Sequence, residues 1–213
     1  MAVVCPTITA VDPHEYRAQM VAIEPFAKRV HIDLMDGEFA PSKSPSLDHV
    51  WWPHKMTADL HLMYQNPMDF IDKLVKLKPS LVIIHNEAQV HHMHFAAVLH
   101  KHDIQAGLAL LQDTPVAYAR QIIHSFDHIL VFSGQLGFHG GHADLSLVDK
   151  VREIRALHPE AEISWDGGIN SDNAKQLVSA GVDVLNTGGY IQKADNPANA
   201  YATISSVIND KQT

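Results

Sequence analysis

The chain of 213 residues has little cysteine and no long apolar run. Its one cysteine, Cys5, has no partner for an intramolecular disulfide. No stretch approaches the roughly 18 consecutive apolar residues that suggest a transmembrane helix. The opening segment, MAVVCPTITA, lacks the basic start and the long apolar run of a signal peptide. These absences predict a protein that works in the reducing cytoplasm.

Positive charge is also scarce. The chain has 16 Lys and Arg against 24 Asp and Glu, which gives a net charge of −8 when histidine is neutral. An acidic chain offers no extended basic surface, so we expect neither nucleic acid nor a membrane as a partner. With 46% hydrophobic and 19% charged residues, the composition is that of a folded protein. The length predicts one domain over residues 1–213. As partners we expect a small-molecule substrate and further copies of this chain in a homo-oligomer.

Short apolar runs alternate with longer amphipathic segments, which is typical of strands that alternate with helices. The expected strands are 3–8, 29–34, 56–62, 81–84, 105–110, 128–132, 162–165 and 182–186. The expected helices are 14–26, 69–77, 89–102, 115–124, 145–157, 173–180 and 197–208. Parallel neighbours need a crossover connection, so this order favours a parallel sheet that closes into a (β/α)₈ TIM barrel. The alternative is an open doubly wound sheet, but no GxGxxG motif follows the first strand.

Four side chains that can bind a metal ion lie at the ends of three expected strands. His31 and Asp33 are two residues apart in VHIDLMDG, so they face the same side of their strand. His61 ends the next strand and Asp166 ends the seventh. TIM-barrel active sites lie at this end of the strands. Two imidazoles and two carboxylates suit one divalent ion, and Zn²⁺, Fe²⁺, Mn²⁺ and Co²⁺ all stay open.

Two carboxylates on separate strands also suit proton transfer at carbon. Removing a proton next to a ketone builds negative charge on the carbonyl oxygen, and a divalent cation lowers this barrier as a Lewis acid. One carboxylate then takes the proton, and a second, protonated carboxylate returns one to the opposite face of the enediolate. We therefore expect Asp33 and Asp166 to invert a carbon centre.

Several motifs resemble the ribulose-phosphate 3-epimerase family in their order and spacing. They are VHIDLMDGEFAPS, DLHLM, IIHNEA, AGLALLQDTP and ISWDGGI, and the resemblance spans about residues 6–191. It implies a metal-dependent barrel that inverts C3 of a ketose phosphate, with D-ribulose 5-phosphate and D-xylulose 5-phosphate as the main pair. It also implies that His31, Asp33, His61 and Asp166 are the metal ligands. Asp33 and Asp166 match the family's acid and base.

The resemblance also indicates which residues contact the substrate. Thr7 stands where the family usually has a serine, while Met35 and Met63 match methionines beside the reacting carbons. Glycine pairs follow the last three expected strands, and in a barrel such turns share one rim, where phosphate sites commonly form. The residues expected to contact the phosphorylated substrate are Gly140, Gly141, His142, Gly168, Gly188 and Gly189.

The turn after the sixth strand departs from the family. Where the family typically has Pro-Gly-Phe-Gly-Gly-Gln, this chain reads SGQLGFHGGH, with Leu136 for proline, an added His139, and His142 for glutamine. Phe132 also replaces a methionine. These departures leave open another ketose phosphate, such as allulose 6-phosphate, or a non-catalytic barrel that binds a metal or a sugar phosphate. Orotidine-decarboxylase-like enzymes are disfavoured, because their DxKxxD motif is here DLHLMYQ, without lysine.

Overall fold

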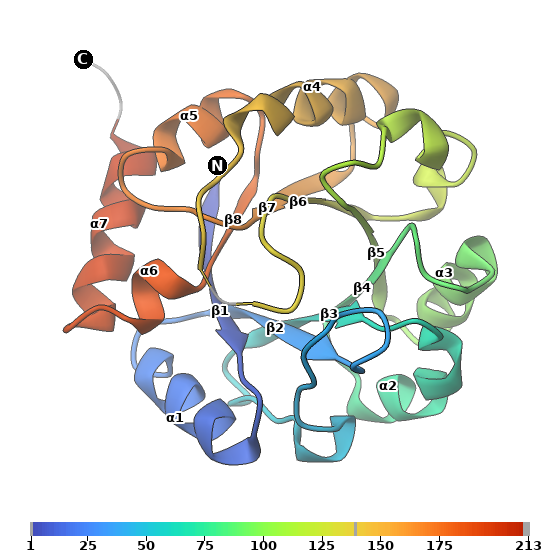
Figure 1. Ribbon diagram of the computed structural model, residues 1–213, viewed down its shortest axis with the longest axis horizontal. Helices are drawn as coiled ribbons and strands as arrows, with labels where there is room; N and C mark the ends of the chain where they lie inside the picture. The colour runs from blue at the N-terminus through green and yellow to red at the C-terminus, as the bar shows by residue number, and fades with distance from the viewer. Residues whose placement is uncertain (1, 139, 211–213) are drawn as a thin grey trace.

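The structure is a computed structural model that describes residues 2–138 and 140–210, so the added His139 lies outside the described residues. Within these ranges, parallel strands close into a barrel in sequence order (Figure 1). They are β1 (Val3–Thr9), β2 (Arg29–Met35), β3 (Thr57–Met63), β4 (Leu81–His85), β5 (Gln105–Leu110), β6 (His128–Phe132), β7 (Glu162–Asp166) and β8 (Val184–Thr187). The pairing of β1 with β8 closes the sheet. The predicted TIM barrel is therefore confirmed.

Helices surround the barrel. They are α1 (Pro13–Ile23), α2 (Ile71–Leu77), α3 (His92–His100), α4 (Val148–Leu157), α5 (Ala174–Ser179), α6 (Gly189–Gln192) and α7 (Pro197–Asn209). Asp12 begins α1 by accepting hydrogen bonds from the N–H groups of the first turn, and Asn196 does the same for α7. Both helices have proline at their start, which suits the fixed φ of that residue. No helix in the described ranges is long and apolar enough to cross a membrane.

The prediction of a helix over residues 115–124 is wrong. This segment instead holds two short 3₁₀ helices, Val116–Ala119 and Ile123–Ser125. Its buried side chains are Val116, Ala119 and Ile123. Spacings of three and four residues fit 3₁₀ turns and an α-helix equally well over so short a stretch, so the apolar pattern could not separate the two. Other short 3₁₀ helices are Leu47–His49, Pro67–Phe70 and Leu145–Leu147.

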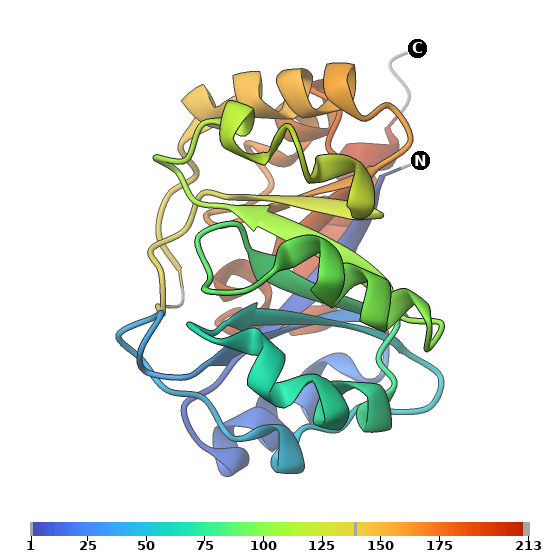
Figure 2. The same ribbon diagram turned by 90° about the vertical axis from the view of Figure 1, so that its right-hand side faces the viewer.

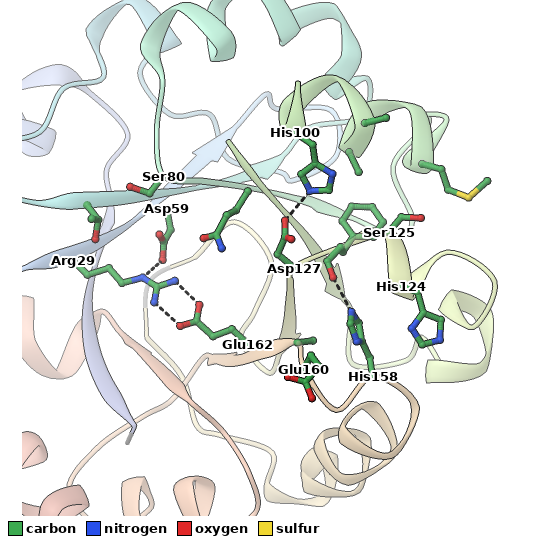
Figure 3. Close-up of a pocket in the computed structure, with 17 residues that line it drawn as sticks. Arg29, Asp59, Ser80, His100, His124, Ser125, Asp127, His158, Glu160 and Glu162 are labelled. Atoms are coloured by element: carbon green, nitrogen blue, oxygen red, sulfur yellow. Dashed lines mark hydrogen bonds and ion pairs between the residues drawn. The ribbon is translucent and has the colours of Figure 1, made fainter. Parts of the chain in front are cut away.

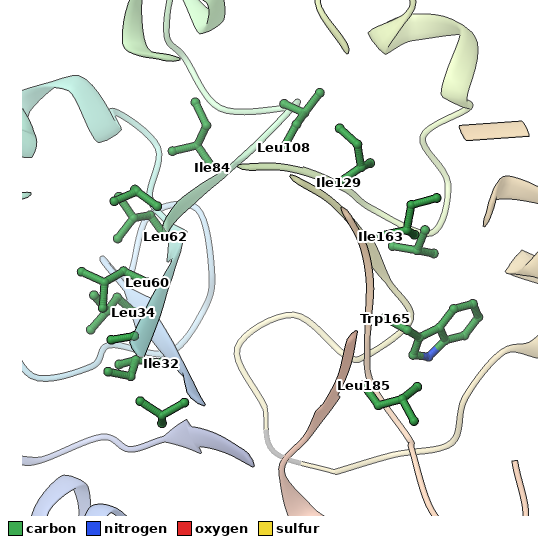
Figure 4. Close-up of a cluster of buried hydrophobic side chains, with 14 of the residues drawn as sticks. Ile32, Leu34, Leu60, Leu62, Ile84, Leu108, Ile129, Ile163, Trp165 and Leu185 are labelled. Carbon is green, nitrogen blue, oxygen red and sulfur yellow. The ribbon is translucent and has the colours of Figure 1, made fainter. Parts of the chain in front are cut away.

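Strand side chains alternate between the helices and the barrel interior, and this alternation positions the site. The outward-facing apolar residues are buried against the helices (Figure 4): Ile32, Leu34, Leu60, Leu62, Ile84, Leu108, Ile129, Ile163, Trp165 and Leu185. Because Ile32 and Leu34 face outward, His31 and Asp33 must face the interior. The same reasoning places His61 between its outward neighbours Leu60 and Leu62.

The loops that follow β2 and β6 lie at one end of the barrel, away from both chain termini (Figure 2). They also touch each other. A Cβ built on Gly137 would lie 3.1 Å from Cδ of Pro41, and Gly137 has a φ of +82°, so a larger residue would be strained there. These loops border the mouth at the carboxyl ends of the strands, where the predicted site residues lie.

Candidate metal and active site

The four predicted metal ligands converge at this mouth. Nε2 of His31 lies 3.4 Å from Oδ1 of Asp33 and 3.8 Å from Oδ2 of Asp166. Nδ1 of His61 lies 2.9 Å and 3.8 Å from the same two oxygens. One ligand atom from each residue lies within 4.8 Å of the others. Ligands about 2.1 Å from a tetrahedral cation are roughly 3.4 Å apart, so the spacing is close to that of a metal site.

Unpaired atoms in the cluster give an independent test of this fit. The His31 side chain is fully buried, and neither of its ring nitrogens has a hydrogen-bond partner among the described residues. A buried nitrogen without a partner is costly, and a cation facing Nε2 would satisfy it. Oγ1 of Thr9 donates to Oδ2 of Asp33 at 2.6 Å, which leaves Oδ1 directed at the two histidines. The donor set therefore fits a divalent metal ion.

The surroundings of the two aspartates shift their pKa values in opposite directions. Burial alone would raise the pKa of Asp33, but the close approach of His31 and His61 outweighs it and holds this pKa well below its usual range. Burial raises the pKa of Asp166, and the nearby charge of Asp33 raises it further. Burial also lowers the pKa of His61 to about 4, so this imidazole is neutral and can act as a ligand.

The cluster opens into a cavity of about 270 Å³. Asp33 and Asp166 line this cavity together with eight of the predicted substrate contacts: Thr7, Met63, Gly140, Gly141, His142, Gly168, Gly188 and Gly189. The three glycine turns therefore meet on one rim. Met35 instead packs near Met63 and lines a neighbouring cavity, so its contact with the substrate stays a prediction.

Gly168 also has a structural role. Its φ is +68°, and a Cβ there would overlap the backbone of Ala143. Close packing between the turns after β6 and β7 therefore requires glycine at this position, whatever the turn binds.

Asn186 is a site residue that the sequence did not indicate, and it lies beside Asp166 in the sheet and lines the same cavity. Asn186 is 2% exposed, and within residues 2–138 and 140–210 neither its amide oxygen nor its amide nitrogen has a hydrogen-bond partner. Thr7 is also 2% exposed, and its Oγ1 has no hydrogen-bond partner in the same two ranges. The available signal for Asn186 was its place between an apolar, outward-facing Leu185 and the glycine turn that starts at Gly188. The sequence likewise indicates no role of its own for His85 within the IIHNEA motif.

A larger cavity of about 820 Å³ lies at the opposite end of the barrel (Figure 3). There Nε of Arg29 donates to Asp59 at 2.7 Å, and its two terminal nitrogens donate to the Glu162 carboxylate at 2.8 and 2.7 Å. His128 lies 2.8 Å from the same carboxylate and 2.7 Å from Oγ of Ser164. These groups mainly bind one another, so we interpret this end as a structural polar network.

Comparison with known proteins gives the family. The model of the ribulose-phosphate 3 epimerase family matches residues 3–192. A ribulose-phosphate 3-epimerase from Helicobacter pylori is 30% identical over 199 residues, which cover 90% of this chain and 91% of the relative. One from Mycobacterium bovis is 29% identical over 208 residues, which cover 94% and 90%.

Solved structures agree on the fold. The 3-hexulose-6-phosphate synthase from Salmonella typhimurium gives a TM-score of 0.70 at 16% identity, covering 97% of this chain and 98% of that one. The 3-keto-L-gulonate-6-phosphate decarboxylase from Vibrio cholerae gives 0.73 at 10% identity, covering 98% and 97%. At such identities the likeness shows the barrel alone. The match over residues 3–192 goes further, and this chain belongs to the ribulose-phosphate 3-epimerase family, whose members are isomerases of phosphorylated sugars.

Proposed function

We propose that this protein is a metal-dependent ketose-phosphate 3-epimerase that interconverts D-ribulose 5-phosphate and D-xylulose 5-phosphate. The observation that carries the proposal is the pair of carboxylates, Asp33 and Asp166, beside two buried histidines on the wall of one cavity. Asp33 lies on β2 and Asp166 on β7, and β8 and β1 separate these strands in the closed sheet. The two carboxylates therefore approach a bound substrate from different sides.

The proposed reaction needs one proton acceptor and one proton donor. A divalent cation held by His31, Asp33, His61 and Asp166 would stabilise the negative charge that develops on the substrate carbonyl oxygen. One aspartate removes the proton from C3, and the other, protonated, delivers a proton to the opposite face. The centre inverts, and the two aspartates finish with their protonation states exchanged. Thr9 supports this chemistry by holding the orientation of the Asp33 carboxylate.

Unpaired polar atoms support a polyhydroxylated substrate. Thr7 offers a hydroxyl, and Asn186 offers both an N–H donor and a carbonyl acceptor, all buried on the cavity wall. Asn186 lies beside Asp166 in the sheet and two residues before Gly188, so it would lie between the reacting carbon and the phosphate of the proposed substrate. Substrate hydroxyls would pair with these atoms and remove the cost of leaving them unsatisfied.

The glycine turns support a phosphate at the far end of the substrate. Gly140, Gly141, Gly188 and Gly189 bring backbone close to the cavity without side chains in the way, and backbone N–H groups bind anions well. Nζ of Lys193 lies 3.7 Å from the position that a Cβ would take at Gly140, which adds a positive charge nearby. A local cation and local dipoles outweigh remote charges that are screened beyond roughly 8–10 Å.

Another ketose phosphate, such as allulose 6-phosphate, is the second candidate. Phe132 and His142 both line the cavity, and both differ from the residues typical of the family. The experiment measures kcat/KM of the Zn²⁺-, Mn²⁺- or Co²⁺-loaded protein on both phosphates and on free ribulose, with exchange at C3 followed by NMR. We expect the highest value for D-ribulose 5-phosphate. A higher value for the hexulose phosphate reassigns the substrate, equal values for ribulose and its phosphate exclude a phosphate site, and binding without exchange indicates a non-catalytic barrel.

The cytoplasmic location and the homo-oligomeric state also belong to this proposal. Cell fractionation tests the first. Light scattering of the purified protein at several concentrations tests the second, and a monomer at all of them contradicts it.

A further inference from the structure

A chain of buried polar groups continues from His61 away from the cavity. Nε2 of His61 lies 2.9 Å from Nε2 of His85, at the end of the neighbouring strand β4. Nδ1 of His85 lies 3.5 Å from Oε2 of Glu87, which is longer than an ordinary hydrogen bond, and neither atom has another hydrogen-bond partner among the described residues. Glu87 is held in turn, because its Oε1 accepts hydrogen bonds from Oγ1 of Thr114 and from the backbone N–H of Leu111. The chain therefore links the proposed metal site to the loop after β5.

The two imidazoles constrain each other's protons. Two ring nitrogens 2.9 Å apart share one proton when both rings are neutral, so one nitrogen donates and the other accepts. A carboxylate such as Glu87 only accepts, which favours a proton on Nδ1 of His85. Nε2 of His85 then accepts the proton of His61 Nε2, and Nδ1 of His61 keeps a free lone pair. That lone pair points at Asp33, His31 and Asp166.

We propose that His85 and Glu87 are positioning residues for the metal site, which hold His61 in the tautomer whose Nδ1 can bind a cation. The inference rests on the proposed metal site. Asp33 favours the other tautomer, because its Oδ1 lies 2.9 Å from Nδ1 of His61 and would stabilise a proton there. Without the acceptor at His85, the ring would lose its preference for the metal-binding tautomer. Histidine ligands of metals commonly depend on such a partner behind the ring.

The packing of His85 allows a substitution that removes its hydrogen bonds and keeps its aromatic contacts. Its ring is fully buried, with its centroid 4.7 Å from that of Phe39 and 5.9 Å from that of Phe132. His85→Phe keeps an aromatic ring in this apolar contact and removes both nitrogens. His85→Gln keeps a carbonyl oxygen that can accept the proton of His61. His92 supplies the matched control, because within the described residues its Nε2 donates to the backbone oxygen of His85, at 3.0 Å, and to no other group.

The experiment measures Zn²⁺ affinity by competition with a chromophoric chelator for the wild-type protein, His85→Phe, His85→Gln, Glu87→Gln and His92→Phe. Thermal melting checks that each variant folds, and long-range ¹H–¹⁵N NMR reports the His61 tautomer in metal-free protein. We expect His85→Phe to weaken Zn²⁺ binding about 10- to 100-fold and to shift the His61 proton from Nε2 toward Nδ1. We expect a smaller loss for Glu87→Gln and wild-type affinity for His92→Phe.

The outcomes separate this inference from the proposed function. Rescue of Zn²⁺ affinity by His85→Gln supports a hydrogen-bonding role for His85 over simple packing. Wild-type affinity and an unchanged tautomer in His85→Phe would overturn the inference and leave the metal site intact. If His85→Phe does not fold, Glu87→Leu, which removes the acceptor behind His85, carries the same test. Absence of Zn²⁺ binding by the wild-type protein contradicts the proposed metal site itself.

Discussion

Asp33 and Asp166 both face Nδ1 of His61, at 2.9 and 3.8 Å, yet they come from strands that two other strands separate in the barrel. Their environments move their pKa values in opposite directions: burial and the Asp33 charge raise the value for Asp166, and the histidines lower that of Asp33 despite its burial. Such a pair can hold one proton between two carboxylates. This is the starting state that proton transfer to and from opposite faces requires.

Substitution of either aspartate therefore tests the two-base scheme. Asp33→Asn and Asp166→Asn should each lower epimerisation by about 10²- to 10⁴-fold or more, because each removes one proton-transfer group. A single variant could still exchange the C3 proton with solvent from the remaining face. Both residues are also proposed ligands, so metal content is measured in the same samples. Full turnover by Asp166→Asn would exclude two-base transfer.

Gly188→Val tests the phosphate site. A side chain at this turn should keep the phosphate away from the backbone, so KM for the phosphorylated sugar should rise while metal content stays at the wild-type level. Steady-state kinetics and metal analysis on the same preparation check this. His142→Gln is the companion variant, because it restores the residue typical of the family, and it should be mild or beneficial. Loss of metal in Gly188→Val, with no change in KM, would contradict the placement of the phosphate.

Arg29→Met tests the structural network at the other end of the barrel. Asp59, whose side chain is 2% exposed, would be left as a buried charge without its partner. Such a change typically costs about 3–5 kcal/mol of stability. Arg152→Met is the control, because its pair with Asp149 is exposed and is worth at most about 1 kcal/mol. Equal denaturant midpoints for the two variants would show that the network contributes little.

Stability should also fall in acid through Glu162. Burial tends to raise its pKa, but hydrogen bonds with Arg29 and His128 outweigh this and hold the pKa well below its usual range. A lowered pKa in the folded protein adds stability that is complete above about pH 4.3, the unfolded value, and is lost as the pH falls further. Unfolding free energies at several pH values check this. In Glu162→Gln the unfolding free energy should fall less steeply below about pH 4.3 than in the wild-type protein. The same fall in both proteins would contradict the assignment.

Local patterns were sufficient to predict the barrel and the convergence of His31, Asp33, His61 and Asp166 at one end of it. Alternation fixed which strand side chains face inward, so His31 and Asp33 could be placed from Ile32 and Leu34 alone. The carboxyl ends of parallel strands share one rim, which brought His61 and Asp166 to the same place. The observed strand β7 is one residue longer than the expected strand 162–165, and it ends at Asp166 itself.

Features that depend on neighbours across the sheet could not be predicted in this way. Asn186 becomes notable only because its buried amide has no hydrogen-bond partner in the part of the chain that the structure describes. His85 becomes notable because β4 pairs with β3 in the register that places it behind His61. Apolar spacing likewise could not separate 3₁₀ turns from a helix over residues 115–124. In each case the deciding contacts come from distant segments or from the backbone hydrogen bonds.

Metal-dependent exchange of the C3 proton of the substrate tests the proposed reaction most directly. The metal is removed from the protein with a chelator, and the protein is dialysed into D₂O. D-ribulose 5-phosphate is then added, and the sugar phosphate is followed by NMR before and after addition of Zn²⁺, Fe²⁺, Mn²⁺ or Co²⁺. We predict that deuterium enters C3 and D-xylulose 5-phosphate forms only after a metal ion is restored. Full epimerisation by the stripped protein, or no exchange with any of the four ions, would contradict the proposed reaction.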